Sequence, residues 1–140
     1  MSAHWTSRYI GLPYAALGRS RAGCDCYGLA RIIYQEELGI TLPDYLGYAS
    51  VEEHGEIAAL IDGAQRLPMW VPVTGPAMAF DMAVFRRGRL STHLGVVVRR
   101  GLMIHMVDED CAKIERYDTG RWGQRLAGHW RHVDVVGCAA

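Results

Sequence analysis

The side chains of this sequence that are best suited to covalent chemistry are its cysteines and histidines. A cysteine thiolate is a strong nucleophile, and a histidine exchanges protons near neutral pH. The four cysteines stand at positions 24, 26, 111 and 138, and the six histidines at positions 4, 54, 93, 105, 129 and 132. These residue types favour nucleophilic catalysis by a thiol that is paired with an imidazole base.

Cys26 is the cysteine whose position favours a reactive thiolate. Apolar residues of segment 26–38 recur at helical spacing, Asp25 is a good N-cap before it, and Gly39 is a good stop after it. Cys26 then occupies the first helical position, where unpaired backbone N–H groups and the positive end of the helix dipole lower the pKa of a thiol. The alternative is a buried cysteine that only fills space, and the histidines decide between the two.

Structural metal and disulfide bonds fit these cysteines poorly. A single residue separates Cys24 from Cys26, whereas zinc sites use pairs separated by about two to four residues. Segment 9–18 is too weakly apolar for a signal peptide, and Arg19 and Arg21 interrupt its end. We therefore expect a protein made in the cytoplasm with reduced thiols, with no metal and with no other cofactor.

His93 and His105 are the histidines that are expected to complete the site. They lie in apolar segments, 93–98 and 102–107, which are typical of two strands joined by a turn at 99–101. A loop with an odd number of residues places both imidazoles diagonally on one face, and an even loop without a bulge places them on opposite faces. In the first case His105 orients His93, and Gly95 leaves room for the second ring.

The elements that position these residues predict an α+β fold with an antiparallel sheet. Both faces of the hairpin 93–107 are apolar, so it should lie in the middle of the sheet with a helix on one side. A loop is expected over 63–80. The remaining elements, read from apolar spacing, are a second helix at about 51–61 and strands at 82–85, 113–117 and 129–136.

Composition supports one globular domain spanning residues 1–140. Half of the 140 residues are hydrophobic and 21% are charged, a mixture that excludes disorder and collagen-like structure. The formal net charge is zero, which argues against nucleic acid as a partner. No membrane span is expected, because the longest uncharged stretch, residues 67–80, is short and holds three prolines.

Several blocks of the sequence, taken together, resemble the NlpC family of papain-like cell-wall cysteine peptidases. The nucleophile block of that family is an Asp-Cys pair, a small residue, Gly and an apolar residue, then a helix that ends in Gly-Ile-x-Leu-Pro. The base block is a His followed by an apolar residue, Gly and a β-branched run. The matching segments, in the family's order, are 11–14, 23–29, 39–43, 81–85, 92–97 and 104–105.

The resemblance implies a papain-like core, with N-terminal helices on an antiparallel sheet and the nucleophile at a helix N-terminus. It implies hydrolysis of an amide in peptidoglycan stem peptides, between D-γ-glutamyl and diaminopimelate, through a thioester. The roles that it implies are Cys26 as nucleophile, His93 as base, His105 as orienting group, Tyr14 as a supporting hydroxyl for the oxyanion, and Asp25 and Tyr27 as residues that contact substrate.

Two positions depart from the family pattern. The family often has Ser where this chain has Tyr27, which affects substrate preference, and Gly where it has Phe80, which predicts a local change of the loop. The length and the ending 125–132 resemble the branch found in phage tail-assembly proteins and gene transfer agents, so delivery in a tail particle is expected. The alternatives are a non-catalytic tail component, and a thiol amidase or acyltransferase acting on another small amide or a lipid.

Overall fold

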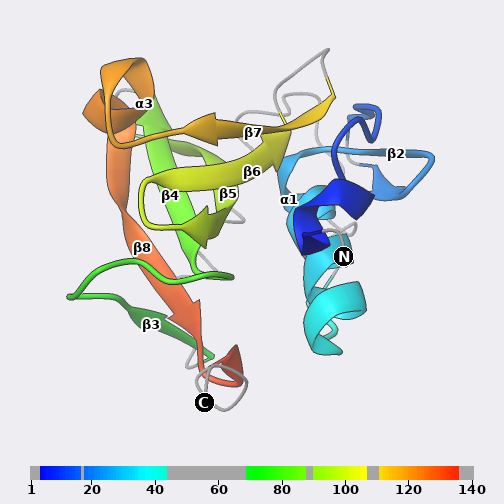
Figure 1. Cartoon of the computed structure of the whole chain (residues 1–140), viewed down its shortest axis with the longest axis horizontal. Helices are drawn as coiled ribbons and strands as arrows, with labels where there is room; N and C mark the ends of the chain where they lie inside the picture. Colours follow the sequence, from blue (N-terminus) through cyan, green and yellow to red (C-terminus); the bar gives the residue numbers. More distant parts are fainter. Residues whose placement is uncertain (1–3, 17, 44–68, 88–89, 107–110, 136–140) are drawn as a thin grey trace.

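A six-stranded antiparallel sheet is the largest element of the structure (Figure 1). The computed structural model describes residues 4–16, 18–43, 69–87, 90–106 and 111–135. Helices pack on this sheet, so the expected α+β class is confirmed. In spatial order the strands are β3 (Trp70–Pro72), β8 (Leu126–His132), β4 (Met82–Arg87), β5 (Leu90–Arg99), β6 (Leu102–Met106) and β7 (Ala112–Arg116).

The helical part of the chain precedes and flanks this sheet. Helix α1 (Cys26–Ile33) packs against β5 and β6, and α3 (Gly120–Arg125) packs against β4 (Figure 1). A short 3-10 helix, η1 (Trp5–Arg8), and a two-stranded ribbon of β1 (Arg19–Ser20) and β2 (Gly23–Cys24) come before α1. A π-helical turn, η2 (Tyr34–Leu38), extends α1 as far as Gly39, so the helix expected over 26–38 is present.

The start of α1 is fixed by Asp25 and Gly28. Asp25 is the N-cap, and its Oδ1 accepts the backbone N–H of Gly28 at 2.7 Å. The same oxygen lies 2.8 Å from Nη1 of Arg19, and both side chains are almost completely buried. Gly28 lies against the backbone of the preceding segment, because a Cβ built on it would be 2.1 Å from the carbonyl oxygen of Gly18.

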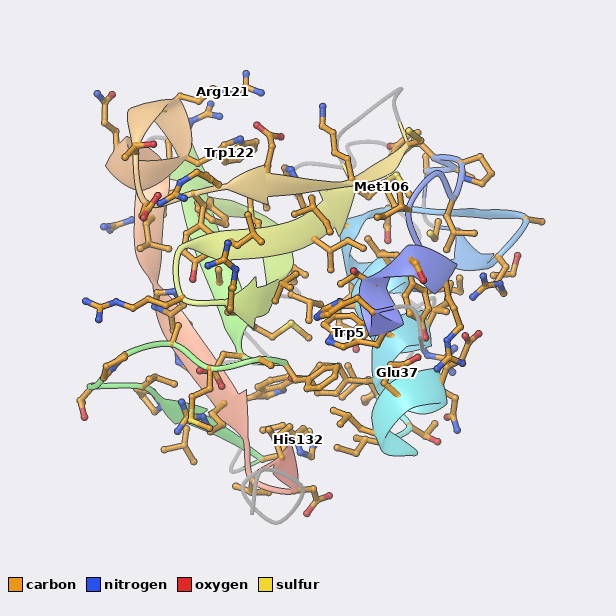
Figure 2. The ribbon with its side chains drawn as sticks, viewed as in Figure 1. Trp5, Glu37, Met106, Arg121, Trp122 and His132 are labelled. Atoms are coloured by element: carbon orange, nitrogen blue, oxygen red, sulfur yellow. The ribbon has the colours of Figure 1, made fainter. Side chains whose placement is uncertain are left out.

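The two faces of the sheet carry separate hydrophobic clusters. The helix-side cluster joins α1 to alternate residues of the strands, including Val84, Leu94, Val96, Ile104 and Met106. The Trp122-side cluster lies on the opposite row and contains Ala83, Phe85, Val97, Met103, Tyr117 and Trp122. Figure 2 shows Trp122, a residue of α3, at one end of the sheet, whereas Met106 lies near the N-terminal segments. The central hairpin is therefore buried on both faces, as the sequence predicts.

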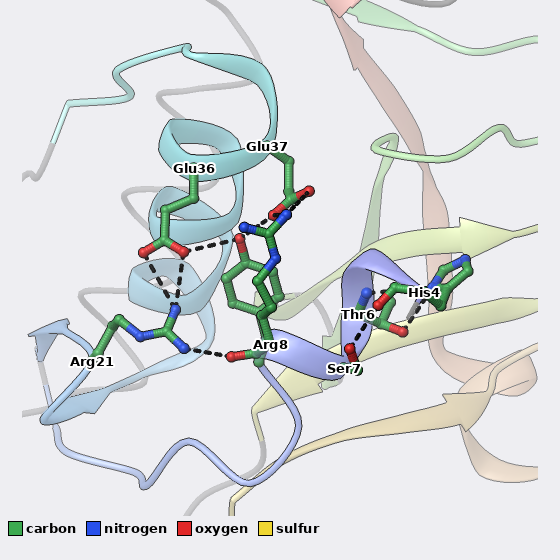
Figure 3. A network of polar contacts seen from close by, with 8 residues as sticks. His4, Thr6, Ser7, Arg8, Arg21, Glu36 and Glu37 are labelled. Carbon is green, nitrogen blue, oxygen red and sulfur yellow. Dashed lines mark hydrogen bonds and ion pairs between the residues drawn. The ribbon is translucent and has the colours of Figure 1, made fainter. Parts of the chain in front are cut away.

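A polar network ties the N-terminal segment to η2 (Figure 3). The hydroxyl of Tyr9 donates to Glu37 at 2.6 Å and to Glu36 at 3.1 Å. Arg21 binds Glu36 at 3.0 Å and also donates to the carbonyl of Arg8. Tyr9 is completely buried, and the two carboxylates keep it protonated, because burial and their charge raise its pKa. The network holds the segment before α1 in place.

Phe80, which precedes β4, stands where the family pattern has glycine. Its φ of 72° is the left-handed conformation that glycine adopts easily and that is uncommon for other residues. The Phe80 carbonyl accepts a hydrogen bond from Tyr34, and its ring stacks on Trp5 with 4.7 Å between centroids. The backbone therefore has a glycine-like shape although the residue is Phe, and aromatic packing holds it there.

Other sequence expectations differ from the structure in their details. The second helix at about 51–61 lies outside the described residues. The loop expected over 63–80 contains β3, whose residues pair with β8, and the last strand is Leu126–His132 rather than 129–136. Helix α3 was not expected. None of the helices in the described part of the chain is long and apolar enough to cross a membrane.

We predict that Gly28→Ala destabilises the protein. In an exposed helix this change stabilises by about 1 kcal/mol. Here the added methyl group meets a backbone carbonyl that cannot move independently, and we expect a net loss of about 2–3 kcal/mol in the free energy of unfolding. Urea unfolding followed by circular dichroism measures it. Gly75→Ala is the control, since nothing lies within 4 Å of its Cβ position. A Gly28→Ala variant as stable as the wild type would contradict the close contact.

Candidate active site

His93 and His105 are brought into direct contact. Nε2 of His93 lies 2.8 Å from Nδ1 of His105, and the rings are nearly perpendicular with 5.0 Å between centroids. The predicted ring-to-ring hydrogen bond on one face of the hairpin is therefore present. His105 is fully buried and His93 is half-buried.

The turn that produces this contact differs from the expected one. The strands are joined by two residues, Arg100 and Gly101, rather than three. The pairs Val97–Met103 and Arg99–Leu102 enclose a bulge, which adds one residue to β5. An even loop alone would put the two imidazoles on opposite faces, and the bulge returns them to the same face.

Gly95 provides the space that the second ring needs. A Cβ built on Gly95 would lie 2.5 Å from Sδ of Met103 and 3.2 Å from Cβ of His105. The methionine end is flexible, but the β-carbon of His105 is fixed by its strand. A larger residue at this position would push His105 away from His93, so the expected role of Gly95 is confirmed.

Glu115 extends the row of polar groups beyond His105, and the sequence analysis missed it. Its Oε1 lies 2.9 Å from Nε2 of His105, and its Oε2 accepts Nε1–H of Trp122 at 3.3 Å. On β7, Lys113 opposes His105 and Glu115 opposes Met103. Glu115 is therefore diagonal to His105 on the same face. The available signal was an acidic residue two positions after Lys113, the residue that opposes His105. Recognising that signal required the register between β6 and β7.

Trp122 covers the histidine pair on the face away from α1. Its ring stacks on His93 with 5.0 Å between centroids and an interplanar angle of 29°. It meets His105 edge-on at 5.1 Å. Phe85 adds a tilted contact with His93 at 6.0 Å. This aromatic cover removes water from the hydrogen bond between the two rings, which strengthens it.

The surroundings favour neutral imidazoles and an ionised carboxylate. Burial lowers the pKa of His93 to about 3, and the nearby charges of His105, Arg125 and Arg121 act in the same direction. Burial also lowers the pKa of His105, although the hydrogen bond and charge of Glu115 oppose it. For Glu115, burial raises the pKa, but the bond from His105 and the charge of Lys113 outweigh burial and leave the pKa lowered.

Cys26 is the first residue of α1 and belongs to the helix-side cluster. Its exposed fraction is 5%. His93 alternates with Leu94 and therefore lies in the row that faces Trp122, so the helix and the histidine pair approach β5 from different sides. A second bulge lies directly before His93, since Phe85 opposes His93 and Arg86 opposes Ser91. Such a bulge bends a strand and re-aims the side chain next to it.

Asp25 is confirmed as the N-cap of α1. Its exposed fraction is 1%. Its Oδ1 accepts hydrogen bonds from the backbone N–H of Gly28 and from Nη1 of Arg19. Its second oxygen, Oδ2, is buried and has no hydrogen-bond partner within the described ranges. A buried carboxylate oxygen in this state costs free energy unless another donor reaches it. The expectation that Asp25 contacts substrate remains a prediction.

Cys24, Tyr14 and Tyr27 surround the start of α1. Cys24 is fully buried, and burial together with the charge of Asp25 raises its pKa to about 11, against the opposing charges of the nearby arginines. The backbone of Tyr14 forms a parallel bridge with Cys24, which places Tyr14 close to the segment before α1. Tyr27 is buried, and its hydroxyl donates to the carbonyl of Pro43 at 2.5 Å. The substrate contact expected for Tyr27 is still a prediction.

The described residues include groups that can carry out proton transfer and nucleophilic attack. Within the part of the chain that the structure describes, no three His, Cys, Asp or Glu side chains are grouped so as to hold a metal ion. The structure instead has a row of hydrogen bonds from His93 to Glu115 and a thiol at a helix N-terminus. These are the parts of a thiol nucleophile with a base and an orienting group.

Comparison with known proteins gives a consistent family. The model of the NlpC/P60 family matches residues 11–131. An NlpC/P60 family protein from Bacillus cereus is 25% identical, with a TM-score of 0.65, and the match covers 91% of this chain and 37% of that one. A lipoprotein-like NLP/P60 family protein from Staphylococcus aureus is 24% identical, with a TM-score of 0.63, and the match covers 90% of this chain and 38% of that one. This chain spans little more than a third of both.

A third structure is similar over most of its own length. The NlpC/p60 domain of the peptidoglycan hydrolase SagA is 20% identical, with a TM-score of 0.54, and the match covers 79% of this chain and 82% of that domain. No curated protein matches the chain at a significant level. The family model spans the segments that carry Cys26, His93 and His105, and the fold agrees, so the chain belongs to the NlpC/P60 family.

Proposed function

We propose that this protein is a cysteine peptidase that hydrolyses an amide bond in peptidoglycan stem peptides. The observation that carries the proposal is the hydrogen bond between Nε2 of His93 and Nδ1 of His105. Because that bond occupies Nε2, Nδ1 is the ring nitrogen of His93 that remains for Cys26. Membership of the NlpC/P60 family, and the likeness to the domain of a peptidoglycan hydrolase, support the choice of substrate.

The reaction proceeds by acyl transfer through a thioester. Neutral His93 takes the thiol proton of Cys26 on Nδ1 while the sulfur attacks the amide carbonyl. The proton then passes from His93 to the leaving amine, and the C–N bond breaks. A water molecule deprotonated by His93 attacks the thioester and releases the acid and the free thiol. The bulge before His93 supports this transfer, since it bends β5 beside the ring.

The start of α1 is suited to stabilise the tetrahedral oxyanion. The backbone N–H of Cys26 lies in the first turn, where N–H groups have no partner within the helix. Each such donor is typically worth about 3 kcal/mol in the transition state. Tyr14 adds a hydroxyl from the neighbouring segment, which the bridge to Cys24 holds close.

The proposed bond is that between D-γ-glutamyl and diaminopimelate residues of the stem peptide. The proposal that Asp25 contacts this substrate rests on its place directly before Cys26 in the chain. Tyr27 adjusts substrate preference through the position of its ring, which the hydroxyl bond to the Pro43 carbonyl and the contact with Arg19 fix.

A phage-like tail particle is the proposed means of delivery to the cell wall. The formal net charge of zero provides no electrostatic attraction to an anionic wall. Synthesis in the cytoplasm and assembly with tail or gene-transfer-agent proteins would bring the enzyme to its substrate without such attraction. Co-purification with tail particles from a producing strain tests this part of the proposal.

The central test is digestion of purified diaminopimelate-type peptidoglycan, with mass analysis of the released fragments. We expect the wild type to cut the D-γ-glutamyl–diaminopimelate bond. Cys26→Ser and His93→Ala should reduce the rate by about 10³-fold or more, because both act in every step. Cys24→Ser should retain most activity. An active Cys26→Ser beside an inactive Cys24→Ser would overturn the assignment, and no fragments from any folded variant would favour a non-catalytic component.

Alkylation by iodoacetamide should distinguish the two neighbouring thiols. Cys24 is buried and its pKa is raised to about 11, so almost none of it is thiolate at pH 7.5. We expect Cys26 to react at least about 10-fold faster, because a helix N-terminus favours its thiolate. Mass analysis of the tryptic peptide 22–31 gives the rates, and Cys24→Ser and Cys26→Ser assign the site. Faster labelling of Cys24 would contradict the prediction.

The acid limb of kcat/KM should lie well below pH 6. The base must be neutral, and the lowered pKa of His93 keeps it neutral until the pH falls through the lowered value. An unperturbed histidine would instead give a limb near its ordinary pKa of about 6.5. Initial rates on a soluble stem-peptide substrate from pH 4 to 8 test this prediction, because kcat/KM should show no acid limb within that range. A limb near pH 6.5 would mean that His93 is better solvated in the working enzyme.

A further inference from the structure

We propose that Glu115 is a positioning residue that sets the protons of both histidines, so that Nδ1 of His93 is unprotonated when it receives the thiol proton of Cys26. The inference rests on the proposed function, which it deepens by adding a fourth group to the site. Its basis is the unbroken row of contacts from His93 through His105 to Glu115, with distances of 2.8 and 2.9 Å.

The carboxylate determines the proton on the first imidazole. An ionised carboxylate accepts hydrogen bonds and donates none. Nε2 of His105 must therefore carry the proton in the contact with Oε1 of Glu115. Because burial keeps His105 neutral, its Nδ1 has no proton and acts as an acceptor.

The second imidazole follows from the first. Nδ1 of His105 accepts, so Nε2 of His93 must donate across the 2.8 Å contact. A neutral His93 with its proton on Nε2 has a lone pair on Nδ1, which is the form that a base requires. A histidine alone as the third residue could adopt either tautomer, and Glu115 selects the productive one.

Glu115 also supplies the negative charge that His105 lacks. When His93 takes the proton of Cys26, its ring becomes an imidazolium while Nε2–H remains bonded to His105. A neutral imidazole offsets little of that charge, but the carboxylate lies directly behind it. The side chain of His105 has an exposed fraction of 0%, so solvent screens this interaction weakly.

Trp122 makes the requirement for a carboxylate strict. Its Nε1–H donates to Oε2 of Glu115 at 3.3 Å, while His105 donates to Oε1. Both neighbours of Glu115 are thus donors, and both need an acceptor. A glutamine has one carbonyl oxygen and one amide nitrogen, so it satisfies only one of them. Lys113, 3.9 Å from Oε1, further favours the ionised form.

The variant Glu115→Gln should therefore reverse the proton order. If its carbonyl turns to Trp122, its amide donates to Nε2 of His105, and Nδ1–H of His105 then donates to His93. Nδ1 of His93 becomes protonated and cannot act as the base. We expect kcat to fall by about 10²–10³-fold with little change in KM, because the group acts through proton position rather than binding.

Trp122→Phe provides the rescue that a merely structural role would not give. Without Nε1–H of Trp122, the glutamine at position 115 can turn its carbonyl to His105. Its amide then faces solvent, since the side chain at this position is partly exposed. The single variant Trp122→Phe should lose activity several-fold through weaker packing on His93. In the Trp122→Phe background, adding Glu115→Gln should lower kcat by less than about fivefold. Glu36→Gln is the matched control, since Glu36 has a similar exposed fraction and lies in the N-terminal network.

The readout that needs no activity is the histidine tautomer, measured from ¹⁵N and ¹³C chemical shifts of labelled protein. We expect the proton on Nε2 of both His93 and His105 in the wild type, and on Nδ1 of both in Glu115→Gln. Three results would overturn the proposal. They are wild-type rings protonated on Nδ1, unchanged tautomers in Glu115→Gln, and an equal loss of kcat from Glu115→Gln in the wild-type and Trp122→Phe backgrounds. Correct tautomers in a protein that leaves stem peptides uncut would instead reject the proposed function.

Discussion

The hydrogen bond between His93 and His105 is the interaction on which the rest of the site depends. It exists because a bulge at the end of the β5–β6 hairpin compensates for a two-residue turn. It is held at contact distance because Gly95 has no side chain and because Trp122 stacks on His93 on the sheet face away from α1. Without any one of these features the two rings would separate or exchange their bond for water.

The position of Cys26 depends on a different constraint, the close approach of α1 to the segment before it. Gly28 allows the helix to rest on the carbonyl of Gly18, and Asp25 joins the helix start to Arg19. This contact fixes Cys26 in the first turn of α1. The helix then packs on β5 and β6, the strands that carry the histidines. Two rigid units, a helix start and a bulged hairpin, thus determine where thiol and imidazole lie.

Local sequence patterns predicted the fold class, the helix at 26–38 and its cap at Asp25, because each depends on neighbours along the chain. The shared face of the two histidines was expected from a three-residue turn, whereas it arises from a two-residue turn and a bulge in β5. Local patterns did not predict β3, which forms only where β8 is available as a partner. They also did not specify the left-handed conformation of Phe80, which its packing on Trp5 accompanies. Helix α3 is too short for helical spacing to reveal it.

By itself the sequence determined which residues are chemically capable, since a capped helix start beside a cysteine and two histidines in apolar strands can be read from local order. Only the tertiary structure decided the proton arrangement. The bond from His105 to Glu115 depends on the register between β6 and β7, and the bond from Trp122 on how α3 folds back over the sheet. Register and docking are set by packing between segments distant in sequence, and a pattern within one segment does not contain that information.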